Sequence, residues 1–374
     1  MKIESLDVRL VDIPFRVEFR HASAARSQTQ GIWVEARSDG GHVGCGESCP
    51  REYVTNEDTA SAVAFFNRHR IELGERITGL SELRIWMAEH QEAIDANPAA
   101  WCAIELALLD LMARYTDQST EALLGLAEID GEFRYTAVLG DAGAEIFRAQ
   151  LTKYYELGFR DFKVKLSGDL TRDRKKMLAI RSAGSPVRVR VDANNLWSVP
   201  EEAVNHLTAL ESELLAVEEP LQPRSFKDLA GVAEALGTRI ILDESFTHVG
   251  QVPLFVDVGS QWIVNVRLSK LGGILRSLEV IDRLRPTGIQ IIIGAQVGET
   301  SLLTRAALLI ANCSRDILVA QEGAFGTWLL ERDVCTPALM FGAGGVLASR
   351  AQLTPKAPGF GLDFTGASSC TREV

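Results

Sequence analysis

The amino-acid sequence predicts an α/β fold, a (β/α)8-type TIM barrel preceded by a smaller α+β unit. Two observations support this prediction. From about residue 131, eight short runs rich in β-branched residues recur, and helix-like segments separate them. Seven of these runs end in a polar or small residue at steps of 24 to 28 residues, about the length of a strand, a helix and their two loops. A doubly wound open sheet is the alternative, but it has no reason to supply eight such evenly spaced units.

The N-terminal unit, residues 1–128, is expected to begin with antiparallel strands. Residues 2–14 and 31–48 are typical of strands, and Gly40 and Gly41 form a turn inside the second stretch. Helices follow, and the clearest begins with Asn97 as the N-cap and Pro98 in the first helical position. Its apolar residues recur at helical spacing and form one face: Ile104, Ala107, Leu108, Leu111 and Met112.

The eight predicted barrel strands are, in chain order, YTAVL (135–139), DFKVKL (161–166), VRVRVD (187–192), LLAVE (214–218), RIILD (239–243), WIVNVR (262–267), IQIIIG (289–294) and DILVAQ (316–321). Active sites of such barrels lie at the carboxyl ends of the strands. The polar or small residues at these ends are Lys165, Asp192, Glu218, Asp243, Arg267, Gly294, and Gln321 with Glu322. Their placement predicts an active site at this end of the barrel.

Composition excludes two classes of partner. The 374 residues carry a formal net charge of −11, with acidic and basic residues interspersed. Nucleic acids and anionic membranes both attract clustered positive charge, so neither is expected as a partner. The N-terminus lacks the pattern of a signal peptide, and no stretch approaches the ~18 apolar residues of a membrane span. The six scattered cysteines favour reduced thiols and a cytoplasmic protein over a disulfide framework or structural zinc.

Three carboxylates end three consecutive strands, namely Asp192, Glu218 and Asp243. Neighbouring strands lie about 4.8 Å apart, so three inward carboxylates can share one cation. Oxygen ligands of this kind suit Mg²⁺ before Mn²⁺. The alternative is that each acidic residue is solvated or caps the following helix. Asn194 returns to the inward face if its strand persists, whereas the neighbours Glu219 and Glu244 are expected to point away from the barrel axis.

Lys163 and Lys165 lie two residues apart, and therefore on one face of the second strand. Their repulsion and a nearby divalent cation should depress the pKa of at least one of them, so that it can act as a general base. Solvated surface lysines are the alternative. Because strand six lies four strands from strand two, Arg267 should face Lys165 across the lumen.

Five motifs resemble the enolase superfamily in their order and spacing. They are KVKL (163–166), VDANN (191–195), VEEP (217–220), LDES (242–245) and NVRLSKLGG (265–273). Within it, the chain is most similar to the muconate lactonizing enzyme subgroup of the mandelate racemase/muconate lactonizing enzyme family. The resemblance implies a capping domain at 1–128, a barrel at 129–342 that carries the catalytic and metal residues, and a C-terminal segment at 343–374 that returns to the capping domain. APGFGLDF (357–364) is similar to the family's closing segment.

The resemblance also implies the chemistry. Mg²⁺ would hold a substrate carboxylate while a base removes the α-proton, and the cation would stabilise the resulting enediolate. By position, Lys165 is the acid/base, Lys163 its electrostatic partner, and the ligands are Asp192, Glu218 and Asp243. The partner is then a small-molecule carboxylate, and barrels of this family commonly form homo-oligomers.

Substrate contacts are expected in three places. The resemblance assigns such contacts to Glu299 and Glu322, at the ends of strands seven and eight, and Asn194 is a further candidate. The stretches 19–30 and 46–53 match the family's loops that close over the barrel, and they add the following candidates: His21, Arg26 and Arg51. Exposed loop charges are the alternative for these three.

Arg267 departs from the pattern, because this subgroup normally has a second lysine there. A guanidinium is effectively never deprotonated in a protein, so Arg267 cannot act as a base. Lys270 has the opposite strand parity, which makes it a poor replacement. His248 could reach the site, although nothing in the sequence requires it.

The sequence therefore favours one-base chemistry, as in a muconate cycloisomerase-like or o-succinylbenzoate synthase-like enzyme, that is, a cycloisomerase or syn-dehydratase. Arg267 would supply fixed charge or hydrogen bonds. A racemase or epimerase of an amino-acid or dipeptide-type substrate is the alternative, and a catalytically silent carboxylate-binding relative is a second one. A phosphate-binding barrel is disfavoured, because Gly272 and Gly273 follow strand six, whereas phosphate sites usually follow strands seven and eight.

Overall fold

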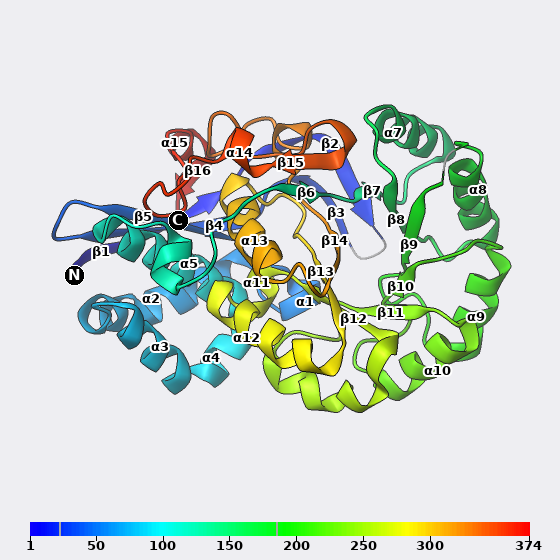
Figure 1. Ribbon diagram of the computed structural model, residues 1–374, viewed down its shortest axis with the longest axis horizontal. Helices are drawn as coiled ribbons and strands as arrows, with labels where there is room; N and C mark the ends of the chain where they lie inside the picture. The colour runs from blue at the N-terminus through cyan, green and yellow to red at the C-terminus, as the bar shows by residue number, and fades with distance from the viewer. Residues whose placement is uncertain (22–23, 185) are drawn as a thin grey trace.

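The computed structural model describes the backbone of residues 1–21, 24–184 and 186–374, and the side chains of these residues apart from 18–21, 24–25 and 258–260. The barrel and the N-terminal unit lie side by side (Figure 1). In the part of the chain that is described, no helix is long and apolar enough to cross a membrane. The six cysteines are free.

Eight parallel strands form the barrel, as predicted. Their order follows the chain: β7 (Ala137–Leu139), β8 (Asp161–Lys165), β9 (Arg188–Asp192), β10 (Ala216–Glu218), β11 (Arg239–Leu242), β12 (Trp262–Val266), β13 (Gln290–Ile293) and β14 (Leu318–Gln321). The last strand returns to the first, because the backbone N–H of Thr136 donates to the carbonyl of Gln321 at 2.7 Å.

Helices cover the outside of the barrel (Figure 1). They are α7 (Ala144–Glu156), α8 (Leu170–Arg181), α9 (Pro200–Ala209), α10 (Phe226–Leu236), α11 (Leu268–Leu271), α12 (Ile274–Leu284) and α13 (Ser301–Cys313). One crossing segment differs from the prediction: between β11 and β12 the chain forms two 3-10 helices, η1 (Val249–Leu254) and η2 (Val256–Gln261). Pro253 lies inside η1, and it lacks the N–H that an α-helix would need there.

The interior of the barrel explains why its polar residues gather at one end. Ala216, Ile241, Ile263 and Ile292 form a buried cluster of their own. Two residues further along the same strands come the polar or small residues of the site, since inward positions recur every second residue. These four strands are therefore apolar inside and polar at their carboxyl ends, whereas β9 places Arg190 inside the barrel, in register with Ala216.

The N-terminal unit is α+β, as predicted. Its sheet has the order β16-β1-β4-β5, with β1 (Ile3–Val11), β4 (Gly31–Ser38), β5 (Val43–Ser48) and β16 (Thr371–Glu373). A separate hairpin joins β2 (Pro14–His21) to β3 (Ala24–Gln28). The helices are α1 (Glu52–Thr55), α2 (Thr59–Arg76), α3 (Leu80–Glu89), α4 (Gln91–Ala96), α5 (Pro98–Tyr115) and α6 (Thr120–Leu124).

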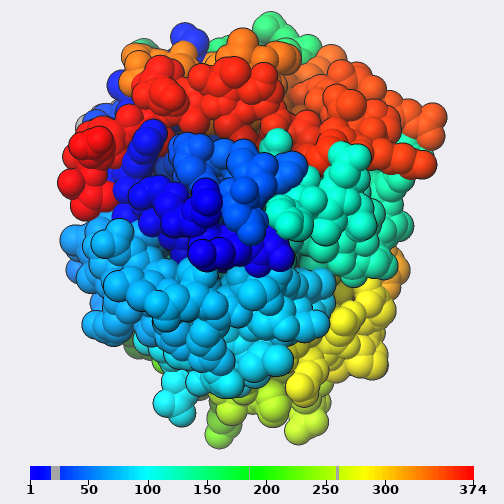
Figure 2. All heavy atoms as spheres, turned by 90° about the vertical axis from the view of Figure 1, so that its left-hand side faces the viewer, coloured from blue at the N-terminus to red at the C-terminus, as the bar shows by residue number. Residues whose placement is uncertain are grey.

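The C-terminal segment returns to this unit, because β16 pairs antiparallel with β1. Figure 2 shows the N-terminal segments (blue to cyan) and the C-terminal segment (red) on one face of the molecule. On the way, β15 (Val346–Ala348) pairs with β6 (Glu132–Arg134). The remaining short elements are η3 (Arg285–Thr287), η4 (Gly326–Trp328), η5 (Ala343–Gly345), α14 (Ser349–Gln352) and α15 (Ala367–Cys370).

Helix α5 is buried over nearly its whole length rather than on one face, from Pro98 to Ala113. It packs directly on β5, where a Cβ at Gly46 would lie only 2.0 Å from the carbonyl oxygen of Ala103. Asn97 is the N-cap residue, as expected, but its side chain makes no capping bond. Glu57 caps the helix instead, because its carboxylate accepts the N–H groups of Ala99 and Ala100.

Two further buried carboxylates of the N-terminal unit cap helices of the barrel. Glu105 on α5 accepts the N–H groups of Ile274 and Leu275 at 2.6 and 3.0 Å, at the start of α12. Glu47 on β5 accepts the N–H and hydroxyl of Thr300 at 2.9 and 2.5 Å, at the start of α13. Burial raises the pKa of each carboxyl to about 8. These contacts hold the N-terminal unit against the barrel.

Candidate active site

A cavity of about 560 Å³ lies at the carboxyl ends of the barrel strands. Its polar lining includes Lys163, Lys165, Asn194, Arg267, Glu299 and Glu322. Val17 and Tyr53 of the N-terminal unit also line it, so both parts of the chain enclose the cavity. This is the end at which the strand-terminal residues predicted a site.

The structure brings Asp192, Glu218 and Asp243 together just below this cavity. Asp192 and Glu218 are in register on the adjacent strands β9 and β10, and Asp243 directly follows β11. All three are at most 1% exposed. They do not line the cavity themselves, whereas Lys163, Lys165 and Arg267, which contact them, do.

Lys163 and Lys165 both point into the barrel, as the two-residue spacing predicted. Lys163 Nζ lies 3.0 Å from Asp192, 2.8 Å from Glu218 and 3.2 Å from Glu322. Lys165 Nζ donates to Asp192 Oδ2 at 2.6 Å and to Asn194 Oδ1 at 2.8 Å. The two ammonium groups therefore share one carboxylate.

The charges of this cluster shift the pKa values of its members. Burial lowers the pKa of Lys163, but Asp192, Glu218 and Glu322 outweigh burial and raise it above its ordinary value. The expected depression is therefore not found for this lysine. Burial also raises the pKa of Glu218 to about 7, against the effect of Lys163. For Asp192, by contrast, Lys163 and Lys165 outweigh the effect of burial and hold the pKa below its usual range.

Arg267 follows β12 on the opposite side of the barrel from β8, since four strand positions separate the two in the ring of eight. Its guanidinium contacts Asp243 Oδ2, lies 3.6 Å from Glu218 Oε1, and donates to Gln296 Oε1 at 3.2 Å. The surrounding carboxylates raise its pKa further despite burial. Arg267 is therefore a permanent positive charge in the wall of the cavity.

The three carboxylates have the donor chemistry of a Mg²⁺ site. Glu218 Oε2 and Asp243 Oδ2 are buried and accept no hydrogen bond, although cationic side chains lie beside them. Lys163 contacts Asp192 and Glu218, and Arg267 contacts Glu218 and Asp243. Among the described residues, the oxygens of these three acids do not all lie within 4.8 Å of one another. A bound cation would take over contacts that Lys163 and Arg267 now make. An oxygen-only donor set of three acids fits Mg²⁺.

Several supporting residues were not predicted. Arg190 lies two residues before Asp192 on β9, is fully buried, and donates to Glu322 at 3.1 Å and to Thr136 at 2.7 Å. The same two-residue spacing would have placed it inward. Asn265, two residues before Arg267, donates to Glu218 at 3.2 Å.

Glu219 and Glu244 are placed differently, although both were expected to point away from the barrel axis. Glu219 is buried and does not line the cavity. Its carboxylate accepts hydrogen bonds from the N–H groups of Asp243 and Ser245 at 2.6 and 2.7 Å, and it thereby supports the loop that carries Asp243. Glu244 lines the cavity, so the prediction that it points away from the barrel axis is wrong. Strand alternation no longer applies to it because β11 ends at Leu242.

Lys270 and His248 do not supply a second base in the cavity. Lys270 is fully buried and donates to the side chain and backbone carbonyl of Asp243 at 2.9 and 2.8 Å, and to the carbonyl of Asn265 at 2.7 Å. His248 lies 4.0 Å from Asp95 and does not line the cavity. Neither residue replaces the lysine that Arg267 displaces.

Three residues predicted to contact substrate do line the cavity: Asn194, Glu299 and Glu322. Asn194 contacts Lys165, as noted above. Glu322 bridges Lys163 and Arg190, at 3.2 and 3.1 Å. Glu299 accepts the N–H of Gln296 at 2.6 Å, and burial raises its pKa to about 7 although Arg267 acts to lower it.

The loop candidates are placed differently. The side chain of His21 lies outside the described residues. Arg51 is buried and donates to the backbone carbonyls of Gln30, Pro50 and Val297, so it joins the N-terminal unit to the segment after β13 and does not line the cavity. Arg26 contacts Gln30 and lies 6.0 Å from the ring of Tyr53, beside the cavity rather than in its lining.

Comparison with known proteins gives consistent matches. The family described as Enolase C-terminal domain-like matches residues 147–368. A hydrophobic dipeptide epimerase of Enterococcus faecalis is 30% identical over 332 residues, 87% of this chain and 92% of that protein. A chloromuconate cycloisomerase of Cupriavidus pinatubonensis is 26% identical over 367 residues, 94% of each protein.

Among solved structures, a dipeptide epimerase from Enterococcus faecalis V583, complexed with Mg and the dipeptide L-Leu-L-Tyr, matches with a TM-score of 0.83. It is 26% identical, and the match covers 97% of this chain and 100% of that chain. The predicted barrel with its capping domain is thereby confirmed.

Proposed function

Since the chain belongs to the mandelate racemase/muconate lactonizing enzyme family of the enolase superfamily, we propose that it uses Lys165 as a base and Mg²⁺ as a cofactor to remove the α-proton of a carboxylate substrate. One observation carries the proposal. Lys165 lines the cavity next to the three acids, while Arg267, which cannot accept a proton, lines the opposite wall.

Lys165 is positioned for proton transfer at one face of a bound substrate. Asp192 and Asn194 fix its amine at 2.6 and 2.8 Å, so little reorganisation is needed when a substrate enters. Mg²⁺ bound among Asp192, Glu218 and Asp243 would hold the substrate carboxylate and stabilise the negative charge of the enediolate. Lys163 adds positive charge at the same place, and Arg267 adds charge that does not depend on pH.

The relatives support the racemase or epimerase alternative more than the cycloisomerase or syn-dehydratase that the sequence first indicated. The hydrophobic dipeptide epimerase is 30% identical to this chain, whereas the chloromuconate cycloisomerase is 26% identical. Two-base epimerisation would require a second acid/base on the side of Arg267. Glu299 is the candidate for that role: it lines the cavity, lies within the electrostatic influence of Arg267, and has a pKa raised by burial to about 7.

The cavity also favours a substrate with an apolar part. In addition to its charged residues, the cavity lining includes five apolar ones: Val17, Ile146, Phe325, Trp328 and Leu329. A carboxylate that carries an apolar amino-acid side chain, such as a hydrophobic dipeptide, would place its charged end at the acids and its apolar end against these residues.

The test is α-proton exchange in D₂O with Mg²⁺ present, followed by NMR for a panel of hydrophobic L,L-dipeptides, N-acyl amino acids and muconolactone-type acids. We expect exchange that requires Mg²⁺ and disappears in Lys165→Ala. Chiral chromatography of the same samples decides the number of bases. Retained configuration supports Lys165 alone, whereas epimerisation that Glu299→Gln abolishes supports the two-base alternative. Absence of exchange for every compound, with and without Mg²⁺, would contradict the proposal.

A further inference from the structure

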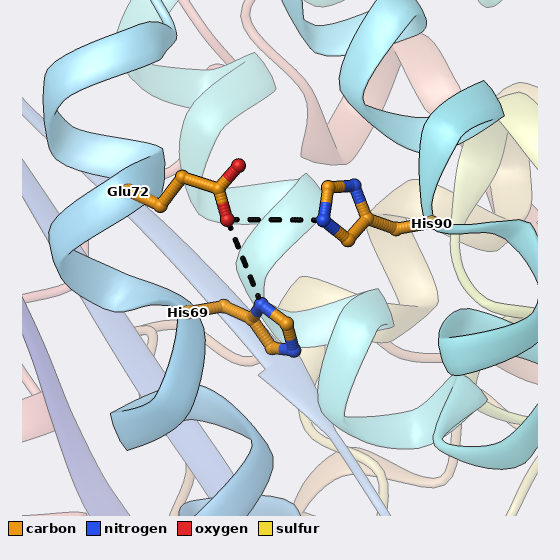
Figure 3. Close-up of side chains that lie close together, drawn as sticks. All are labelled: His69, Glu72 and His90. Atoms are coloured by element: carbon orange, nitrogen blue, oxygen red, sulfur yellow. Dashed lines mark ion pairs between the residues drawn. The ribbon is translucent and has the colours of Figure 1, made fainter.

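Two histidines and a glutamate meet on the surface of the N-terminal unit, away from the active-site cavity. His69 and Glu72 lie three residues apart on α2, and His90 lies between α3 and α4 (Figure 3). Residues three apart share one face of a helix. None of the three lines the cavity. Their ligand atoms all lie within 4.8 Å of one another, and no other group of three potential ligands in the described part of the chain meets this condition.

The spacing of these atoms is close to that of a tetrahedral metal site. Glu72 Oε2 lies 3.9 Å from His69 Nδ1 and 3.7 Å from His90 Nε2. Bonds of about 2.0–2.2 Å to a central Zn²⁺ place tetrahedral ligands roughly 3.4 Å apart. The two separations from Glu72 would therefore have to shorten by only a few tenths of an ångström around such an ion, and the two imidazole nitrogens already lie within 4.8 Å of one another.

His90 is held in the orientation that metal binding requires. Its Nδ1 lies 2.9 Å from the carbonyl oxygen of Trp86, and its ring stacks on the Trp86 indole at 3.9 Å between centroids and 10° between planes. A carbonyl oxygen can only accept, so Nδ1 carries a proton. Nε2 is then the nitrogen that faces Glu72 and can bind a metal ion. A histidine ligand whose other nitrogen donates to a backbone carbonyl is the usual arrangement at protein metal sites.

Glu72 is oriented by a second contact. Its Oε1 accepts from Arg76 at 2.7 Å, and Arg76 also contacts Glu89 at 2.6 Å. This leaves Oε2 to face both imidazoles, as Figure 3 shows. The Glu72 side chain is 37% exposed, so an ion and a water ligand can reach the site from solvent.

A simple hydrogen-bond network explains this arrangement less well. Hydrogen bonds between nitrogen and oxygen span about 2.7–3.2 Å. The separations of 3.9 and 3.7 Å between Glu72 Oε2 and the two imidazole nitrogens are longer than this. The His69 ring also packs beside Phe65 and Trp86, which holds it in place next to Glu72. An ion between the three groups would account for a spacing that is too wide for direct hydrogen bonds.

We propose that His69, Glu72 and His90 bind a divalent transition-metal ion of the Zn²⁺ class, with water as a fourth ligand. Two imidazoles and one carboxylate are a donor set that suits Zn²⁺ or Co²⁺ and does not suit Mg²⁺. The ion ties α2 to the junction of α3 and α4. The site is therefore distinct in position and metal preference from the three acids of the barrel.

The test is a titration of the full-length protein with Co²⁺, in excess Mg²⁺ so that the barrel acids are occupied. We expect one equivalent of Co²⁺ to bind and to give the visible absorption of a tetrahedral or five-coordinate centre. Loss of an outer hydrogen-bond partner typically weakens metal binding roughly 10- to 100-fold, so loss of a ligand in His69→Gln or Glu72→Gln should weaken it at least as much. His42→Gln is the matched control, because His42 is an exposed histidine of the same unit that contacts Tyr115 instead.

A second readout is independent of the spectrum. Zn²⁺ should raise the thermal unfolding midpoint of the wild-type protein and of His42→Gln, but not of His69→Gln or His90→Gln. Glu72→Gln covers the case in which a histidine variant does not fold, because Glu72 is partly exposed. Equal Co²⁺ affinity in the wild type and Glu72→Gln, or the absence of any Co²⁺ centre in the wild type, would overturn the proposal.

Discussion

Replacing Lys163 with methionine would remove a buried positive charge at nearly constant side-chain length. Lys163 is 1% exposed, and its Nζ lies 3.0 Å from Asp192, 2.8 Å from Glu218 and 3.2 Å from Glu322. Breaking a buried ion pair by removing one partner typically destabilises a protein by about 3–5 kcal/mol, because the other charge stays buried without compensation. We expect the free energy of unfolding to fall by about this amount at pH 8.5.

The pH dependence of this loss tests its electrostatic origin. Burial already raises the pKa of Glu218 to about 7, and removal of Lys163 raises it further because the lysine acts to lower it. The folded variant then binds more protons than the unfolded chain above the ordinary pKa of a glutamate, so its stability falls as the pH rises. The loss should therefore be smaller at pH 6 than at pH 8.5.

The assay is urea denaturation of the metal-free protein at both pH values, followed by tryptophan fluorescence. Lys175→Met is the control, because Lys175 is exposed on α8 next to the buried Lys176. We expect the control to unfold like the wild type. A loss below about 1 kcal/mol for Lys163→Met, the size of an exposed pair, or an equal loss at both pH values would refute the reasoning.

Two further predictions concern charge and proton transfer. Arg267→Lys supplies an amine that can lose its proton, so a substrate that the wild-type enzyme exchanges with retention should epimerise in D₂O; unchanged retention would count against the one-base assignment. Glu105→Gln should flatten the dependence of the urea midpoint on pH, measured from pH 5 to 9. Burial raises the folded-state pKa of Glu105 to about 8, so its contribution to stability is present at low pH and lost as the pH rises through that value. A variant curve parallel to the wild-type curve would contradict this.

The inward-facing residues of the barrel could be predicted from the sequence, because side chains along a strand alternate with a period of two residues. Lys163 and Lys165 lie two apart and share one face of β8, and Arg267, two residues after Asn265, directly follows β12. The same rule applied to Arg190 would have found the partner of Glu322. It failed at Glu244, because the strand had already ended at Leu242.

Contacts between segments far apart in the sequence could not be predicted in this way. Glu105 caps α12 from 169 residues away, and Glu47 caps α13 from 253 residues away. Nothing in the local sequence of either residue specifies such a partner, because a buried carboxylate needs only free N–H groups and tertiary packing decides which helix supplies them. The contact of His90 with Glu72 depends on the packing of α3 against α2 for the same reason.

The most direct test of the account is the rate of α-proton exchange catalysed by the wild-type enzyme and by Lys165→Ala with saturating Mg²⁺. The account predicts exchange by the wild type, and a fall in the exchange rate of at least about 100-fold in Lys165→Ala, the lower range of what a positioned general base contributes. An unchanged exchange rate in Lys165→Ala would contradict it, because the proton would then leave through a group other than the lysine at the end of β8.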